Sequence, residues 1–305
     1  MASSGTKWFW GIFLSLVFIG LMFVGICFLV FAKAVSSDRS GFTSMGSGDK
    51  IGIVEVNDVI MSSEKTVEQI KRFRNDKSIK AIIVRINSPG GGVAASQEIY
   101  EEVKRTRESG KIIVVSMGSI AASGGYYISC GANLIIANPG SLTGSIGVIA
   151  QFMNLEQLAD KLGIKYTTIK SGELKDSGNP FRKVNEKDIE YFQDVIDNSF
   201  EQFFAVVAKE RKMDSLKLKE LASGRVFTGL QAKNNGLIDS LGTFEDAVRI
   251  TSQFAGIEGE PRLIMKKKKF SFFEEFIGAK FEDVTEIKKK LFEEPILQYK
   301  FSPIN

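Results

Sequence analysis

The sequence predicts an α/β protein whose sheet is mainly parallel. Apolar runs long enough for buried strands alternate with helical patterns through the first half of the folded region. The predicted strands are residues 51–56, 80–86 and 111–117, and the predicted helices between them are residues 66–75 and 93–107. Strands that alternate with helices at this spacing are typical of parallel βαβ units. With 305 residues, 44% of them hydrophobic, the chain can bury a full-sized core.

The second half of the chain is predicted to add shorter strands and longer helices. We expect strands at residues 133–138, 147–152 and 164–169, a loop at 170–183, and helices at 186–212, 215–223 and 243–252. Phenylalanines and other apolar residues recur at helical spacing in the helix at 186–212, which is typical of a core or subunit-interface face.

The composition argues against several classes of protein. The chain has no histidine and only two cysteines, Cys27 and Cys130, so it lacks the ligand clusters of transition-metal sites. Cys27 lies in an apolar segment and Cys130 in a predicted buried element, which argues against a disulfide. A net charge of +4 gives no indication of nucleic acid binding. We expect no metal, no cofactor and no nucleic acid partner.

An uncharged run at residues 8–32 lies between Lys7 and Lys33. Its 25 residues rise about 1.5 Å each, enough to cross a hydrocarbon core of about 30 Å. Trp8 and Trp10 suit a membrane interface. The run is therefore predicted to be one uncleaved transmembrane helix.

Four parts of the chain differ in composition. Residues 1–33 contain the predicted anchor, and residues 34–50 form a linker rich in serine and glycine. Residues 51–258 are the predicted folded domain, and residues 259–305 are a C-terminal extension. The extension combines a lysine run with phenylalanines, which fits either an amphipathic segment on a membrane surface or a mobile tail.

A candidate nucleophile, Ser123, follows the predicted strand at 111–117 and precedes Gly124 and Gly125. Small residues on both sides allow a tight turn and close approach of another backbone. Since the chain has no histidine, a nucleophilic serine would need a lysine, a carboxylate or the N-terminal amine as its base. The structural alternative is a helix start whose small residues pack against a neighbour.

Residues 89–92, a proline and three glycines, also lie between a predicted strand and a predicted helix. Free backbone amides in such a turn can bind an anion. The turn lacks the ending of a phosphate-binding P-loop and the dinucleotide fingerprint. We therefore favour an oxyanion hole for acyl transfer.

Four motifs in one order give the chain a family resemblance. They are Asn87-Ser-Pro-Gly-Gly-Gly, Ala121-Ala-Ser-Gly-Gly-Tyr-Tyr, Leu142-Thr-Gly-Ser-Ile-Gly-Val and Lys170-Ser-Gly-Glu-Leu-Lys-Asp. Together they resemble the signal peptide peptidase A family, of the short membrane-anchored kind, over residues 51–248. The resemblance implies a Clp-protease/crotonase-like fold of repeated ββα units.

The resemblance also implies a Ser/Lys dyad peptidase. Ser123 would be the nucleophile, Lys175 the general base, and Ser145 the residue that orients the lysine. The oxyanion hole would be formed by backbone amides at Gly90, Gly91 and Gly124. The implied substrates are hydrophobic peptides such as cleaved signal peptides, at the bacterial inner membrane with the catalytic domain in the periplasm.

Lys175 is predicted to lie in a polar loop beside Gly172 and Gly178. A lysine acts as a base only where burial or nearby positive charge lowers its pKa. The resemblance implies that a homo-oligomer, expected to be a ring, provides this environment by sharing each active site between subunits.

Two other classes remain open from the sequence. A crotonase-like enzyme acting on an acyl-thioester would use the same glycine turn with a carboxylate base. A membrane-tethered assembly protein without catalysis would keep the fold without the dyad.

Overall fold

The computed structural model describes residues 8, 10, 13–26, 42–45, 48–266 and 297–301. Most of the predicted C-terminal extension, and residues 9, 11, 12 and 27–32 of the predicted anchor, lie outside these residues. The chain divides into two compact units, Met1–Thr43 and Ser44–Asn305. In the first unit, residues 13–26 are helical and their side chains are exposed. Within the described part of the chain, no helix has the length and apolar character needed to cross a membrane. A short strand, β1 (Phe42–Met45), lies at the boundary between the units.

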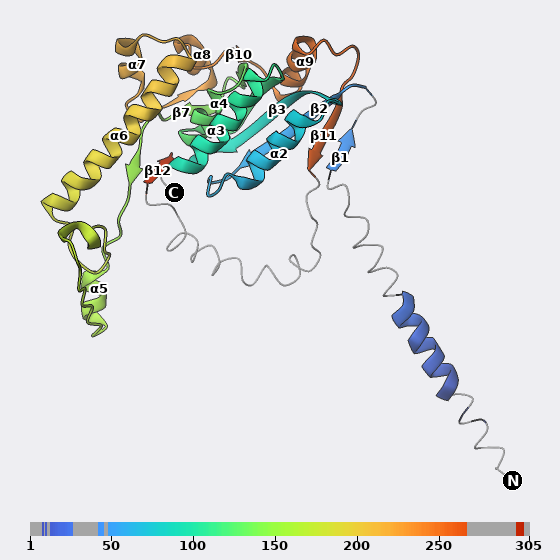
Figure 1. The fold of residues 1–305 in the computed structure, drawn as a ribbon, viewed down its shortest axis with the longest axis horizontal. Helices are drawn as coiled ribbons and strands as arrows, with labels where there is room; N and C mark the ends of the chain where they lie inside the picture. The colour runs from blue at the N-terminus through green and yellow to red at the C-terminus, as the bar shows by residue number, and fades with distance from the viewer. Residues whose placement is uncertain are drawn as a thin grey trace. The chain divides into compact units, whose positions relative to one another are not determined.

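The second unit is built around a mainly parallel sheet, which confirms the predicted α/β class (Figure 1). Its strand order is β11-β2-β3-β5-β6-β10, and neighbouring strands in this series are parallel. In chain order these strands are β2 (Lys50–Asn57), β3 (Ile79–Ser88), β5 (Ile112–Ala122), β6 (Leu134–Ala137), β10 (Ser240–Leu241) and β11 (Arg262–Lys266).

The central strands β3 and β5 are buried on both faces. Ile82, Ile83 and Val84 are fully buried in β3, and Val114 and Val115 in β5. Continuous apolar runs of this kind are typical of parallel strands covered on both sides. This explains why the sequence pattern alone located these strands.

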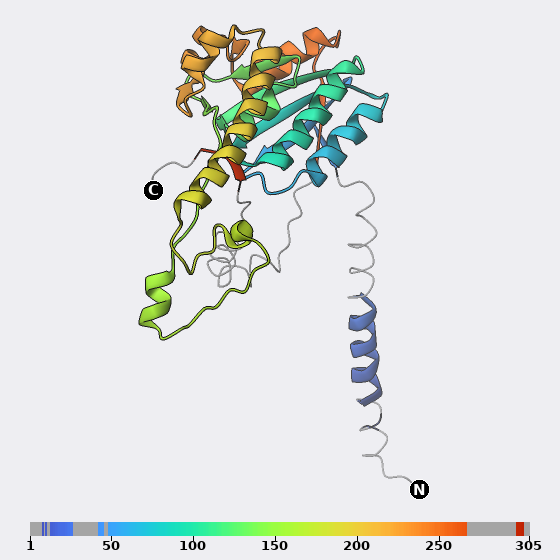
Figure 2. The same ribbon diagram turned by 60° about the vertical axis from the view of Figure 1, so that its left-hand side comes forward.

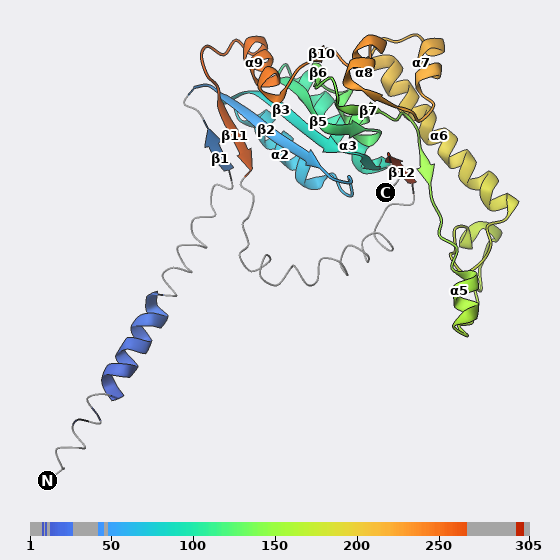
Figure 3. The same cartoon turned by 180° about the vertical axis from the view of Figure 1, so that it is seen from behind.

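Helices cover the two faces of the sheet (Figures 1 and 3). The first face is covered by α2 (Glu64–Asn75), α3 (Val93–Glu108) and the short α4 (Gly124–Ser129). The other face is covered by α9 (Phe244–Phe254), whose Val248 packs against Ile53 and Ile83. Because side chains alternate along a strand, the two helix layers contact different residues of the same strands.

At its C-terminal end, β5 turns to pair with β7 (Leu142–Gly144), which also pairs with the antiparallel β9 (Val226–Thr228). The chain then leaves the sheet through β8 (Ile149–Ala150). A projecting segment, residues 151–185, follows β8; it carries α5 (Glu156–Lys161) and the 3₁₀ helix η2 (Glu173–Asp176) and is seen best in Figure 2. It returns through α6 (Glu186–Glu210), which is followed by α7 (Ser215–Leu221) and α8 (Gly229–Asn235).

One strand prediction in this region is wrong, and a second is too long. Residues 164–169 form no strand, and the strand expected at 147–152 is reduced to β8. The residues at 164–169 are exposed, and no neighbouring strand satisfies their backbone groups. The alternation of apolar residues at 164–169 is real, but these side chains are exposed and do not pack into the core.

Three short strands form a second, antiparallel sheet. β12 (Leu297–Lys300) lies between β4 (Gly90–Gly92) and β8. The glycine turn of the sequence is thus an extended strand that accepts a partner from the far end of the described chain.

The buried position of Ile83 gives a test of the core. We expect Ile83→Ala to lower the free energy of unfolding by about 2–5 kcal/mol, because it leaves a cavity between the sheet and α9. The measurement is denaturant unfolding followed by circular dichroism. Lys80→Ala, at an exposed position of the same strand, is the control and should change stability by less than about 0.5 kcal/mol. Equal effects of the two changes would contradict the assigned core.

Candidate active site

Ser123 lies at the turn between β5 and α4, in an uncommon backbone conformation. Its φ is 53°, in the left-handed region that residues other than glycine rarely adopt. Ser145, directly after β7, has a φ of 49°. Conformations of this kind persist only where the surrounding structure enforces them, and they concentrate at functional sites.

Strand pairing brings Ser123 and Ser145 together. Ala122 is opposite Gly144 in the parallel β5–β7 pair, so the next residues in both strands leave the same edge of the sheet. The Ser123 amide donates to the Gly144 carbonyl at 2.7 Å, and the Ser145 amide donates to the Arg225 carbonyl at 2.8 Å. Both serines are buried.

The Ser123 hydroxyl is buried without a hydrogen bond to any described residue. An unsatisfied buried hydroxyl destabilises a fold by about 1–3 kcal/mol. Nearly all such groups in folded proteins have a partner, so this exception requires an explanation. A nucleophile whose base comes from elsewhere would provide one.

Glycines form a close backbone cradle beside Ser123. A Cβ atom on Gly90, whose φ is 104°, would lie 2.8 Å from the Gly124 nitrogen. A Cβ atom on Gly91 would collide with the backbone of Ile60. Only glycine therefore allows β4 to pass this close to the start of α4.

The cradle has two amides suited to an oxyanion. Gly124 is the first residue of α4, so its N–H has no acceptor within the helix. Gly91 lies at the centre of β4, in the strand that faces β12. The Gly90 amide instead donates to the Ser88 hydroxyl at 3.1 Å. Ser88, which the sequence reasoning missed, is buried and also donates to the Asp58 carbonyl. A serine beside a glycine turn carries no sequence signal for this supporting role.

Lys175 is not brought to Ser123 within the chain. It lies in η2, on the projecting segment, and its side chain is exposed. The segment extends away from the sheet in Figures 1 and 3, with α5 at its tip. No hydrogen bond or ion pair of the Lys175 amine occurs among the described residues.

A charged clamp holds the loop that carries Lys175 against the start of α6. The clamp is formed by Asp176, Arg182 and Asp188. Arg182 donates to Asp176 at 3.0 Å and to Asp188 at 2.9 Å. Hydrogen bonds from Arg182, and next from Lys170, lower the pKa of Asp176 to about 2. The Arg182 hydrogen bond also holds the pKa of the buried Asp188 carboxyl well below its usual range. The loop that carries Lys175 is therefore held in one conformation.

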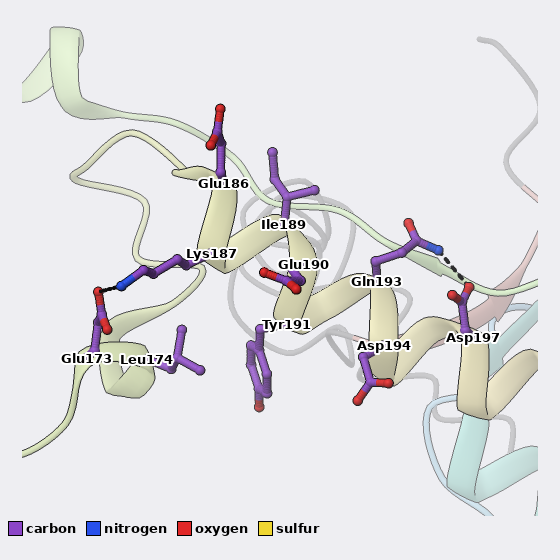
Figure 4. A pocket seen from close by; sticks show the side chains of 10 residues that line it. All are labelled: Glu173, Leu174, Glu186, Lys187, Ile189, Glu190, Tyr191, Gln193, Asp194 and Asp197. Atoms are coloured by element: carbon purple, nitrogen blue, oxygen red, sulfur yellow. Dashed lines mark hydrogen bonds and ion pairs between the residues drawn. The ribbon is translucent and has the colours of Figure 1, made fainter.

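A pocket of about 960 Å³ lies between η2 and α6 (Figure 4). Five of its ten lining residues are acidic, and it contains an ion pair of 2.7 Å between Glu173 and Lys187. None of its lining residues is a serine, threonine or cysteine. The pocket therefore belongs to the surface of the projecting segment and not to the site at Ser123.

A second cavity, of about 580 Å³, lies directly beside Ser145. Ile196 and Phe200 from α6 give it apolar walls, and Lys300 and Phe301 line another side. Of the two serines, Ser145 lines this cavity, together with the charged side chain of Asp197.

A buried serine hydroxyl beside glycine amides at a strand–helix turn is the arrangement that the chemistry of a serine hydrolase requires. Residues 105–258 match the family model described as peptidase family S49. The chain is 44% identical over 210 residues to "Putative protease slr0021" of Synechocystis, covering 68% of this chain and 76% of that protein. It is 42% identical over 180 residues to "Putative signal peptide peptidase SppA" of Enterococcus faecium, covering 59% of this chain and 52% of that protein. It is also 37% identical over 231 residues to "Protease 4" of Salmonella typhi, covering 72% of this chain and 37% of that protein.

The chain belongs to peptidase family S49, the signal peptide peptidase A family, and is a serine peptidase. It spans about half the length of the Enterococcus relative and just over a third of the Salmonella relative.

The charged clamp predicts a pH-dependent effect of Arg182. Its contribution is present above the unfolded carboxyl pKa of about 3.9 and is lost as the pH falls through the folded value of about 2. We expect Arg182→Ala to lower the melting temperature by a constant amount between pH 6 and pH 5, with the difference from the unmodified chain shrinking between about pH 4 and pH 2. Calorimetry at several pH values measures it. Lys104→Ala, which removes the ion pair with Glu101 on α3, is the control. A difference that stays constant with pH would contradict the clamp.

Proposed function

We propose that this chain is a membrane-anchored endopeptidase that uses Ser123 and Lys175 as a catalytic dyad. The observation that carries the proposal is the buried, unpartnered hydroxyl of Ser123, held at a left-handed turn beside the glycine cradle. Membership of the peptidase family argues against both the acyl-thioester enzyme and the non-catalytic assembly protein.

In the proposed reaction, Ser123 Oγ attacks the peptide carbonyl and Lys175 accepts its proton. The Gly91 and Gly124 amides stabilise the negative charge on the carbonyl oxygen, and Gly90 keeps the cradle open. Ser145 orients the lysine amine next to Ser123. Lys175 then gives the proton to the leaving amine, and water hydrolyses the acyl-enzyme.

Lys175 is supplied by a neighbouring subunit of a homo-oligomer in this proposal. The cavity beside Ser145 supports it, because its apolar walls would remove water from an entering amine and favour the neutral form. The projecting segment supports it as well: Ile164, Tyr166 and Ile169 are exposed, Ile169 to 96%. Apolar surface of this extent is typical of an interaction site. A ring is the closed assembly for subunits that reach into one another's sites.

The remaining parts of the proposal concern substrate and location. Residues 1–33 form the anchor, residues 34–50 the tether, residues 51–258 the peptidase domain, and residues 259–305 a C-terminal extension. The catalytic domain has the Clp-protease/crotonase type of repeated unit and lies on the periplasmic side of a bacterial inner membrane. The name of the Enterococcus relative supports hydrophobic peptides, such as cleaved signal peptides, as substrates.

The dyad is tested by Ser123→Ala and Lys175→Ala in the full-length chain. We expect each change to lower kcat/KM for a hydrophobic peptide by several powers of ten, because the nucleophile or its base is lost. The measurement is hydrolysis of an internally quenched peptide by protein in detergent. Lys80→Ala, at an exposed lysine of β3 outside the projecting segment, should keep near-normal activity. An unchanged kcat/KM in Ser123→Ala or in Lys175→Ala would contradict the proposed dyad.

Sharing of the site is tested by mixing the two inactive variants. Subunit exchange creates some sites with an intact serine and an intact lysine, so we expect activity to return in part. Activity is measured before and after exchange, with exchange itself followed by fluorescence transfer between labelled copies. A mixture that exchanges subunits and stays inactive would show that the two residues do not act across a subunit boundary.

A further inference from the structure

Ser88, the last residue of β3, lies between the turn that holds Ser123 and the glycine turn. In the parallel β3–β5 pair it is opposite Ala121, shortly before Ser123. A Cβ atom on Gly125, shortly after Ser123, would lie 3.2 Å from the Ser88 carbonyl oxygen. Ser88 is fully buried. Its backbone therefore packs against both sides of the turn that holds the candidate nucleophile.

The Ser88 hydroxyl links the glycine turn to the loop after β2. It accepts a hydrogen bond from the Gly90 amide at 3.1 Å and donates one to the Asp58 carbonyl. Asp58 has a φ of 59°, in the left-handed region, and its amide donates to the Asn87 carbonyl at 3.1 Å. Both partners of the hydroxyl are main-chain groups, so this bridge depends on the side chain of Ser88 alone.

A second contact, from Ile60, fixes the direction of the Gly91 amide. The Ile60 amide donates to the Gly90 carbonyl at 2.9 Å, and the Gly92 amide donates to the Ile60 carbonyl at 2.8 Å. The Gly90 carbonyl and the Gly91 amide belong to one trans peptide, in which C=O and N–H point in opposite directions. The Gly91 N–H therefore points away from Ile60.

Gly90 is held by hydrogen bonds on both of its peptide groups. Ser88 binds its amide, and Ile60 binds its carbonyl. Its φ of 104° belongs to a region that glycine enters freely, so the residue by itself does not restrict the rotation of the Gly91 amide. An oxyanion donor is effective only when it is already aimed at the place where the charge develops. The two hydrogen bonds on Gly90 supply that restriction.

We propose that Ser88 is a positioning residue of the oxyanion hole, which fixes the direction of the Gly91 amide relative to Ser123. The proposal rests on the proposed function of Ser123 and deepens it. Ser88 acts through Gly90. Its backbone pairing places the nucleophile turn, and its hydroxyl places the peptide that carries the donor. Loss of the hydroxyl should therefore weaken stabilisation of the transition state and leave binding of the substrate unchanged.

Kinetics of Ser88→Ala in the full-length chain in detergent test this role. We expect kcat for a hydrophobic peptide to fall about tenfold to a hundredfold with KM within about twofold, because a displaced donor loses part of what a whole oxyanion donor contributes. Ser252→Ala on α9 is the matched control, since Ser252 is buried and its hydroxyl donates to the Val248 carbonyl at 2.9 Å. The control should keep its kcat. An unchanged kcat in Ser88→Ala, or equal losses in the two variants, would overturn the proposal.

A transition-state analogue separates positioning from general damage to the site. The Ser123 oxygen adds to the carbonyl carbon of a peptide aldehyde and places the aldehyde oxygen in the oxyanion hole, and no group leaves. The corresponding peptide alcohol binds without addition. We expect Ser88→Ala to raise the inhibition constant of the aldehyde by at least about tenfold and that of the alcohol by less than about twofold. Equal weakening of both inhibitors would place the defect in ground-state binding and refute the positioning role.

A second variant applies if Ser88→Ala does not fold, as judged by circular dichroism. Ser88→Cys fills similar space, but its thiol is a weak donor and a weak acceptor. We expect kcat to fall by at least about threefold, with the same difference between aldehyde and alcohol. A kcat equal to that of the unmodified chain would count against the proposal.

Ser123→Ala, assayed alongside, distinguishes failure of this proposal from failure of the proposed function. If Ser123→Ala keeps full activity, the proposed function is wrong and the role of Ser88 falls with it. If Ser123→Ala is inactive while Ser88→Ala is fully active, only the role of Ser88 is removed. The expected result is an inactive Ser123→Ala beside a Ser88→Ala with lowered kcat, unchanged KM and weakened aldehyde inhibition.

Discussion

The hydrogen bond from the Ser123 amide to the Gly144 carbonyl is the constraint on which the site depends. A left-handed backbone at a residue other than glycine costs about 1–3 kcal/mol. The buried strand β5 fixes the residues before the turn, and α4 begins directly after it, where the Tyr127 amide donates to the Ser123 carbonyl at 2.8 Å. With the backbone fixed on both sides, the Ser123 hydroxyl is buried without a hydrogen-bond partner among the described residues.

Close backbone packing around Ser123 follows from the same geometry. Gly90, Gly91 and Gly124 leave no space for a Cβ atom, so β4 lies in close contact with Ile60 and with the start of α4. The glycine cradle therefore depends on the short distance between β4 and the start of α4.

The projecting segment, which carries Lys175, is held by charged contacts and not by close backbone packing. Its charged clamp fixes its conformation through ion pairs near the surface, while its apolar side chains face solvent. A segment that is locally ordered yet apolar on its outside fits a contact with another copy of the chain. Within one chain, Ser123 lies beside the glycine cradle, whereas Lys175 lies on the exposed projecting segment.

The sequence by itself determined the central sheet, because continuous apolar runs such as β3 and β5 fit only strands buried on both faces. It also indicated Ser123 and the glycine turn, since small residues between a strand and a helix are a local pattern. The expected strand at 164–169 was wrong because strand formation needs a partner that a local pattern does not reveal. Only the tertiary structure decided that Ser145 lies beside Ser123, that Lys175 lies apart from it, and that β12 pairs with β4. These are contacts between distant segments, and no spacing along the chain encodes which surfaces meet when the sheet and helices pack.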